Sequence, residues 1–105
     1  MNRPVSSRPW SETAGGTDSG ATTTHTGEAD VTFFITHVSA HSDADATLQL
    51  KDGSTVLAEW ALNQYRNSLY STNGEWFSTP GEDVTLALSA STADCHVNMT
   101  GYSIP

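Results

Sequence analysis

The chain has 105 residues, and its 12 acidic side chains against 4 basic ones give a formal net charge of −8. That length suits one domain and is too short for two independent cores. Four scattered bases in so acidic a chain provide no surface for nucleic acid or for an anionic membrane. Cys95 is the only cysteine, which excludes an internal disulfide and a cysteine zinc site.

Apolar residues are spread unevenly along the chain. Val, Ile, Leu and Phe number 18, and Val5 is the only one of them before residue 31. Residues 1–30 are rich in Gly, Ser and Thr and show no regular period, so they predict an extended N-terminal arm, with the folded domain at 31–105. An arm without a core needs a neighbouring protein surface to lie on. Its candidate partner-binding residues are Arg3, Val5, Arg8, Pro9 and Trp10.

From residue 31 onward, apolar residues recur with the period of two that is typical of β-strands. Val31–Val38 is rich in β-branched and aromatic residues and is apolar on both faces, which leaves one face for a partner. Thr47–Lys51 alternates cleanly, and Thr55–Leu62 is its expected return strand. The Asp52-Gly53 pair between them predicts a hairpin turn.

The rest of the chain continues this pattern with one interruption. Residues 63–73 are polar and irregular, Glu75–Ser78 is a short strand, and Val84–Ala90 and Cys95–Met99 alternate again. We therefore predict an all-β fold, a small antiparallel β-sandwich that is jelly-roll-like and is preceded by the extended N-terminal arm. The residues expected to be buried are Phe33, Ile35, Leu48, Leu50, Val56, Trp60, Leu86, Leu88, Val97 and Met99.

The histidines and acids do not form a recognisable reaction centre. His37 and His41 have the four-residue spacing of a zinc-binding helix, but on a strand four residues span about 13 Å, too far apart for one ion. No Ser-His-Asp elbow, glycine-rich phosphate loop or C-x-x-C motif is present. We expect no catalytic residue, no metal and no cofactor, and thus a protein that is not an enzyme.

The C-terminal half has a distinctive order of strand-like segments and turns. Residues 55–60 read TVLAEW and residues 73–102 read NGEWFSTPGEDVTLALSASTADCHVNMTGY, a strand of small residues, a short turn and an alternating strand that closes on Gly101-Tyr102. This arrangement resembles the C-terminal strands of small structural proteins of tailed bacteriophages. The resemblance implies a capsid decoration (cement) protein on the outer surface of the virion, made in the host cytoplasm.

The resemblance also implies partners. They are the major capsid protein, across whose neighbouring subunits the arm would lie, and further copies of the chain in a homotrimer; no nucleic acid or membrane is expected. The candidate residues of the oligomer interface are the large aromatic side chains Phe34, Tyr65, Tyr70, Trp76 and Tyr102.

A second interpretation is a glycan- or host-surface-binding module of a fibre or tail component. Trp60 and Trp76 could line a platform for sugar stacking, although Trp60 shares its face with Val56 and Leu62 and fits the core better. An arm that extends from the domain to other chains would favour the decoration protein. An open aromatic groove that contains Trp76 and a tyrosine would favour the glycan module.

Overall fold

The computed structural model describes residues 7–16, 21–42, 44–62, 66–89 and 95–105, with Gly16 and residues 66–75 described in their backbone only. None of these residues forms a helix with the length and apolar character needed to cross a membrane. The described residues form eight strands: β1 (Arg8–Gly16), β2 (Thr22–His25), β3 (Thr32–Ser42), β4 (Ala46–Asp52), β5 (Thr55–Leu62), β6 (Arg66–Phe77), β7 (Val84–Leu88) and β8 (Cys95–Ile104).

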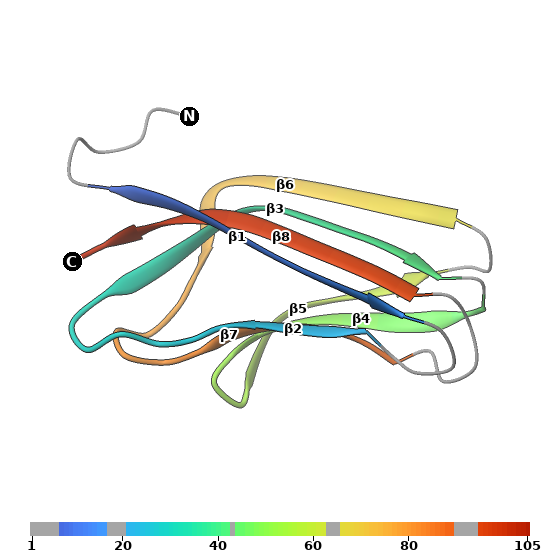
Figure 1. The fold of residues 1–105 in the computed structure, drawn as a ribbon, viewed down its shortest axis with the longest axis horizontal. Helices are drawn as coiled ribbons and strands as arrows, with labels where there is room; N and C mark the ends of the chain where they lie inside the picture. The colour runs from blue at the N-terminus through green and yellow to red at the C-terminus, as the bar shows by residue number, and fades with distance from the viewer. Residues whose placement is uncertain (1–6, 17–20, 43, 63–65, 90–94) are drawn as a thin grey trace.

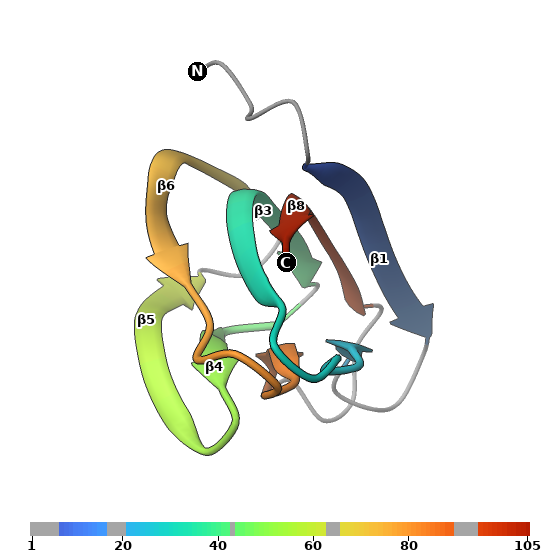
Figure 2. The same ribbon diagram turned by 90° about the vertical axis from the view of Figure 1, so that its left-hand side faces the viewer.

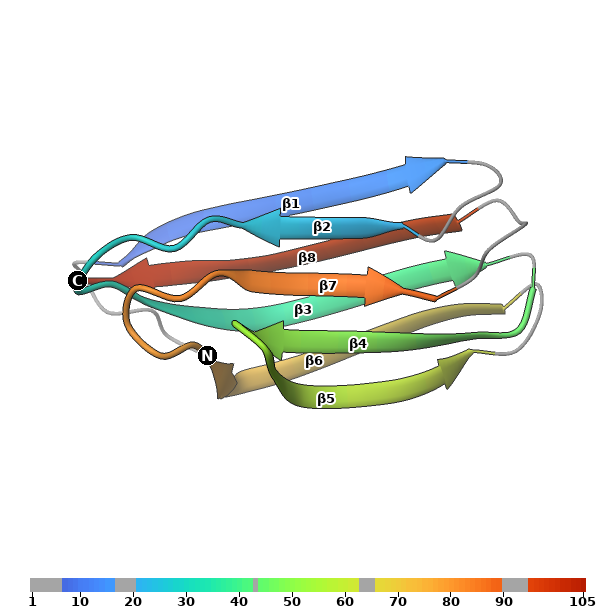
Figure 3. The ribbon, with the colours of Figure 1, turned by 90° about the horizontal axis from the view of Figure 1, so that it is seen from below.

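The strands form two four-stranded antiparallel sheets that face each other (Figure 1). The first sheet has the order β1-β8-β3-β6 and the second the order β2-β7-β4-β5, which Figure 3 shows from below. The hairpin β4–β5 is thus followed outward by the pairs β3–β6, β2–β7 and β1–β8, which is the wrapping of a jelly roll. The predicted antiparallel β-sandwich is confirmed.

The core lies between the two sheets and follows the predicted alternation. Eight of the ten residues expected to be buried are buried: Phe33, Ile35, Leu48, Leu50, Leu86, Leu88, Val97 and Met99. Trp60 is half-buried and packs against this core. Val56 is 43% exposed, so its predicted burial was wrong.

A β-bulge explains why Val56 points outward. Leu50 pairs with Ala58, whereas the next residue, Lys51, pairs with Val56, so Leu57 is an extra residue in β5. An extra residue reverses the alternation of everything beyond it. Val56 therefore shares the outer face with Lys51, and Leu57 packs against the core instead. The predicted hairpin is present, with Gly53 at a φ of 57° as the first residue of its turn.

The expected N-terminal arm was wrong for most of its length. Arg8–Gly16 forms β1, which pairs residue by residue with β8, and Thr22–His25 forms β2, which pairs with β7. Both strands are edges of the sandwich, and β1 lies against β2 in Figure 2. The boundary at residue 30 therefore does not divide an arm from a domain, because a jelly roll needs these two strands to complete its sheets.

The strand β6 is longer than we predicted from the sequence. Residues 63–73 were expected to be irregular, but Arg66–Phe77 is one strand that pairs with β3. In β3, the register with β8 shifts between Ile35 and His37, which makes Thr36 an extra residue relative to β8. On the other side, the same point of β3 faces a larger irregularity, because β6 has residues 72–75 between the partners of Ile35 and His37. The bulge at Thr36 keeps Ile35 and Val38 on the same buried face although they are three residues apart.

Candidate functional site

Aromatic residues of the first sheet occupy both of its faces, and those on the inner face close one edge of the sandwich. The Trp10 ring stacks on His25 of β2, with 4.2 Å between ring centroids and 10° between planes. It also meets Phe33 edge-on at 5.9 Å. His25 Nδ1 lies 2.8 Å from Glu12 Oε2, so the edge includes a polar contact between the sheets. Trp10 is therefore a packing residue of this chain and does not belong to a free arm, and its expected contact with another protein stays a prediction.

The Trp10 ring packs directly over Gly101, its partner on β8. A Cβ built at this position would lie 2.0 Å from the Phe34 carbonyl oxygen and 2.8 Å from the Trp10 ring. Only glycine leaves room there for the indole and for the neighbouring strand. We call Trp10, His25, Phe33 and Gly101 the inner cluster.

On the outer face of the same sheet, four residues lie opposite one another across all four strands. Pro9 of β1 pairs with Tyr102 of β8, Tyr102 with Phe34 of β3, and Phe34 with Phe77 of β6. The rings of Phe34 and Tyr102 stack at 5.1 Å and 9°, and Phe34 is 5.8 Å from Phe77. We call these four residues the outer row. Phe77 ends it with 53% of its surface exposed, whereas Tyr102 is 3% exposed between its neighbours.

The part of this outer face that β1, β3 and β8 form carries no Asp, Glu, Lys or Arg, although the chain has a net charge of −8. The described acids lie mainly in the loops that join the strands, among them Glu28, Asp30, Glu82 and Asp83. Beyond the outer row the face presents Ser11, Thr13, Thr36, His37, Ser39, His41, His96, Asn98 and Thr100.

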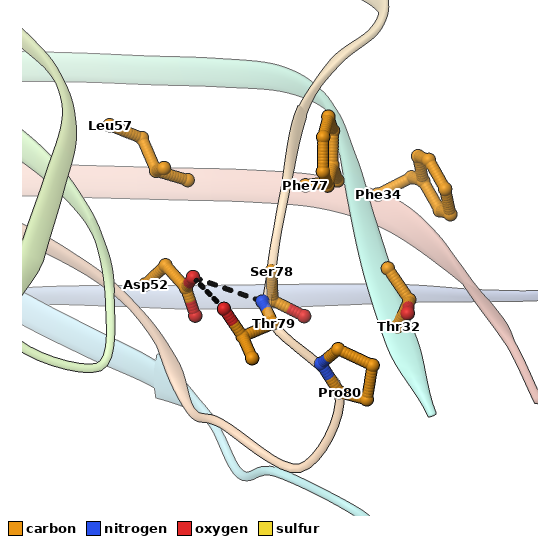
Figure 4. A pocket seen from close by; sticks show the side chains of 8 residues that line it. All are labelled: Thr32, Phe34, Asp52, Leu57, Phe77, Ser78, Thr79 and Pro80. Carbon is orange, nitrogen blue, oxygen red and sulfur yellow. Dashed lines mark hydrogen bonds between the residues drawn. The ribbon is translucent and has the colours of Figure 1, made fainter. Parts of the chain in front are cut away.

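A pocket adjoins the exposed end of the outer row (Figure 4). Its volume is about 590 Å³, within the range of small-ligand sites. It lies where β3 begins, β4 and β6 end, and the chain enters the loop towards β7. Its lining combines two phenyl rings, other apolar groups, hydroxyls and one carboxylate: Thr32, Phe34, Asp52, Leu57, Phe77, Ser78, Thr79 and Pro80.

Hydrogen bonds fix the polar side of the pocket. Asp52 Oδ2 accepts a bond from the Thr79 amide at 2.9 Å and from the Thr79 hydroxyl at 2.8 Å, both drawn in Figure 4. Ser78 Oγ accepts a bond from the Phe33 amide. Asp52 Oδ1 is buried and has no hydrogen-bond partner among the described residues. The carboxylate is thus held rigidly at the pocket while one of its oxygens is unsatisfied.

The structure brings together some of the predicted interface residues and separates others. Phe34 and Tyr102 meet in the outer row, whereas Trp76 packs edge-on against Trp60 at 5.3 Å and lies against the core. The groove of Trp76 and a tyrosine that would favour a glycan module is therefore not formed by Trp76 and Tyr102, which lie on opposite faces of the sheet. Tyr70 belongs to β6 opposite Val38, but its side chain lies outside the described residues, as does Tyr65.

The residues predicted to bind a partner through the arm also lie in different places. Pro9 is exposed in the outer row, and Arg8 is exposed with its guanidinium 3.5 Å from Glu28. Arg3 and Val5 lie outside the described residues. Sequence reasoning missed Phe77, Asp52 and Thr79 as site residues. The available signal for Phe77 was the alternation of the predicted strand Glu75–Ser78, because neighbouring residues of a strand face opposite sides and Phe77 therefore points away from the face of Trp76.

The histidines do not gather into a metal site in the described part of the chain. No group of three or more His, Cys, Asp or Glu residues there could hold an ion. His37 and His41 both lie on β3, and His41 pairs with His96 of β8. Cys95 is buried, as expected for a core thiol.

Comparisons with known proteins give similarities of architecture only. No protein-family model matches the chain, and no curated protein sequence matches it. Among solved structures, CsCBM6-3 from Clostridium stercorarium, solved in complex with cellobiose, is 18% identical with a TM-score of 0.47 and covers 95% of this chain and 83% of its own. The coat protein of Tobacco streak virus is 12% identical with a TM-score of 0.46, covering 100% and 90%.

A third similar structure is the CBM36-1 domain of a multidomain xylanase from the hindgut metagenome of Trinervitermes trinervoides. It is 14% identical with a TM-score of 0.43 and covers 86% of this chain and 74% of its own. At such identities and scores these likenesses support no conclusion about function, because one fold hosts many functions.

Proposed function

We propose that this protein is a non-enzymatic structural component of a tailed-phage virion, which decorates the outer surface of the capsid by docking on the major capsid protein. The observation that carries the proposal is the outer face of the first sheet, which has the outer row and, along β1, β3 and β8, no Asp, Glu, Lys or Arg. Two further points support it. Residues 55–60 and 73–102 resemble small structural proteins of tailed phages, and jelly rolls are frequent among capsid domains.

The outer face has the composition of a protein-binding surface. Core regions of interfaces are depleted in charge and enriched in aromatic residues relative to the rest of the surface. Here a half-exposed Phe77 and an exposed Pro9 flank the stacked rings of Phe34 and Tyr102. Covering this row removes apolar surface from water without burying an unpaired charge.

Docking through a face replaces docking through an arm. Residues 8–16 and 22–25 are used in the sheets, so they cannot extend to distant capsid subunits. The homotrimer implied by the resemblance remains part of the proposal. Sedimentation equilibrium of the purified chain, alone and released from capsids, measures the number of copies directly.

The test is co-sedimentation with capsids stripped of this protein, from the phage that carries its gene. We expect wild-type protein to pellet with the capsids and Phe77→Ser to lose binding at least tenfold. Val56→Ser is the matched control, because Val56 is the other exposed large apolar residue among the described side chains but lies in the second sheet. Equal binding of Phe77→Ser and wild type would contradict docking through the outer row.

A glycan-binding module is the second candidate function, and the pocket beside Phe77 is the observation that favours it. An exposed phenyl ring offers a stacking surface, and Thr32 and Thr79 add hydroxyls. A glycan array probed with the full chain tests this function. Saturable binding that Phe77→Ser removes and Val56→Ser retains would support the module, and an array without binding would contradict it.

A further inference from the structure

We propose that the pocket beside Phe77 binds an arginine side chain of the docking partner. The inference rests on the proposed docking function and identifies the chemistry that the partner presents. It starts from the pairing of one carboxylate with two phenyl rings in one cavity: Asp52 on one side, Phe34 and Phe77 on the other (Figure 4).

The charge of Asp52 is not balanced within the described part of the chain. The ion pairs found there join Arg8 to Glu28 and His25 to Glu12, and neither involves Asp52. Thr79 satisfies Oδ2 with two hydrogen bonds, while Oδ1 is buried without a partner. Because Oδ1 is closed to solvent and no ion pair of the described residues includes Asp52, the charge of this carboxylate stays uncompensated, and a cation in the adjoining pocket gains electrostatic energy from it without a bond to the buried oxygen.

The surroundings strengthen the preference for a cation. A Cβ at Gly53 would lie 2.8 Å from Glu82 Oε2, so the Glu82 carboxylate lies beside the turn that follows Asp52. The neighbouring Asp83 contacts this turn through its carbonyl, which accepts from the Gly53 amide, while its carboxylate accepts from the Gly27 amide. No Lys or Arg is among the residues that line the pocket. The local field therefore repels anions and attracts cations.

The phenyl rings select arginine among cations. A planar guanidinium stacks on aromatic faces and donates several hydrogen bonds in a fixed fork, whereas an ammonium is a compact and strongly hydrated charge. A sugar fits less well, because it needs several free polar partners. The Thr79 hydroxyl already donates to Asp52 and Ser78 Oγ accepts from Phe33, which leaves Thr32 as the hydroxyl in the lining with no such bond.

The position of the pocket fits a docking contact. Phe34 and Phe77 belong both to the outer row and to the pocket lining. A partner that covers the row can therefore place one side chain into the cavity at its end. The uncharged row supplies contact area, and the pocket supplies a charge-specific anchor.

The experiment is a ¹⁵N–¹H correlation titration of the full chain with the blocked tripeptide Ac-Gly-Arg-Gly-NH₂. We expect saturable shifts of the Gly53 and Thr79 amides. The same tripeptide with citrulline, which keeps the shape and removes the charge, should bind at least tenfold more weakly. The lysine tripeptide should fall between the two, and added salt should weaken the arginine peptide.

Variants locate the binding. Asp52→Asn keeps an acceptor for Thr79 but removes the charge, so we expect it to weaken the arginine peptide about tenfold or more. Phe77→Leu keeps an apolar side chain but removes the ring and should weaken it severalfold. Asp30→Asn is the matched control, since it removes one charge at the same end of the sandwich from an exposed residue outside the pocket lining. It should change binding less than twofold.

Each contrary outcome overturns the inference. Equal binding of the arginine and citrulline peptides would show a neutral polar site, and shifts of the same amides by glucose or N-acetylglucosamine instead of arginine would favour a glycan site. No shift with any of these probes would also overturn it. If Asp52→Asn then still co-sedimented with capsids while Phe77→Ser did not, docking through the row would stand without the arginine pocket. If the arginine peptide bound but the wild-type protein did not pellet with capsids, the proposed capsid docking would be contradicted and the arginine pocket would stand.

Discussion

The inner cluster and the outer row use neighbouring residues of the same strands for opposite purposes. Trp10 and Pro9, Phe33 and Phe34, and Gly101 and Tyr102 are adjacent in sequence and face opposite sides of one sheet. The inner members join the two sheets through His25, whereas the outer members stack on each other and end at a half-exposed ring. The inner cluster should therefore set stability and the outer row should set binding.

Removing the two N-terminal strands, which carry Pro9, Trp10 and His25, should have the largest effect. Deletion of residues 1–29 removes β1 and β2, leaves the edges of β8 and β7 without partners and opens the core beside Phe33. We expect a chain without a cooperative thermal transition by circular dichroism. Deletion of residues 1–6 is the control, because it removes no described strand, and it should melt like wild type. A folded 30–105 fragment would mean that β1 and β2 are dispensable.

The adjacent pair Phe33 and Phe34 offers the sharpest stability comparison. Phe33 is fully buried, so Phe33→Ala should lower the free energy of unfolding by about 3–5 kcal/mol. Phe34 is half-buried on the outer face, so Phe34→Ala should cost about 1–2 kcal/mol. Urea unfolding of both variants measures the difference. Equal losses in the free energy of unfolding would contradict the view that the inner face sets stability and the outer face is free to serve binding.

Trp10→Ala distinguishes a packing residue from an arm residue. The half-buried indole stacks on His25 and contacts Phe33, so its loss should lower the free energy of unfolding by about 3 kcal/mol. Pro9→Ala is the control on the outer face and should change it by less than about 1 kcal/mol. An unchanged melting temperature for Trp10→Ala would restore the view of this residue as part of an arm.

Phe77→Ser should have the smallest effect on stability. About half of the Phe77 surface is exposed, so we expect the free energy of unfolding to fall by less than about 1 kcal/mol. Val56→Ser should behave alike, which makes the two variants comparable in binding experiments. A loss above about 2 kcal/mol for Phe77→Ser would mean that weakened docking of this variant reflects unfolding.

The predictable part of the fold lies where large apolar residues alternate. In β4, in β7 and in residues 95–99 of β8 the buried inward positions are Leu, Val, Met and Cys, so the period of two is visible without a structure. In β1 the inward positions are Trp10, Glu12 and Ala14, and β2 contributes Thr23 and His25. Glu12 and His25 interrupt the alternation of apolar and polar residues. Their inward positions are explained only by the contact that they make with each other across the two sheets.

The bulges and the pocket were beyond prediction for other reasons. Leu57 and Thr36 are single insertions that shift the register, and nothing in their neighbours marks them. Asp52 ends β4, whereas Phe77 and Thr79 lie two residues apart at the end of β6, and the two parts meet only through the pairing of β3 with β6 and the packing of the sheets. The resemblance at 73–102 includes Phe77 but gives no reason to expect a carboxylate beside it.

Hydroxyl-radical footprinting of the protein on stripped capsids tests docking through the outer row most directly. Phe77 and Val56 are the two exposed large apolar residues of the described chain, one in each sheet, so a single labelling reaction compares both faces. The account predicts that labelling of Phe77 falls severalfold when the protein binds capsids while labelling of Val56 is unchanged. Protection of Val56 with Phe77 still fully labelled would contradict it.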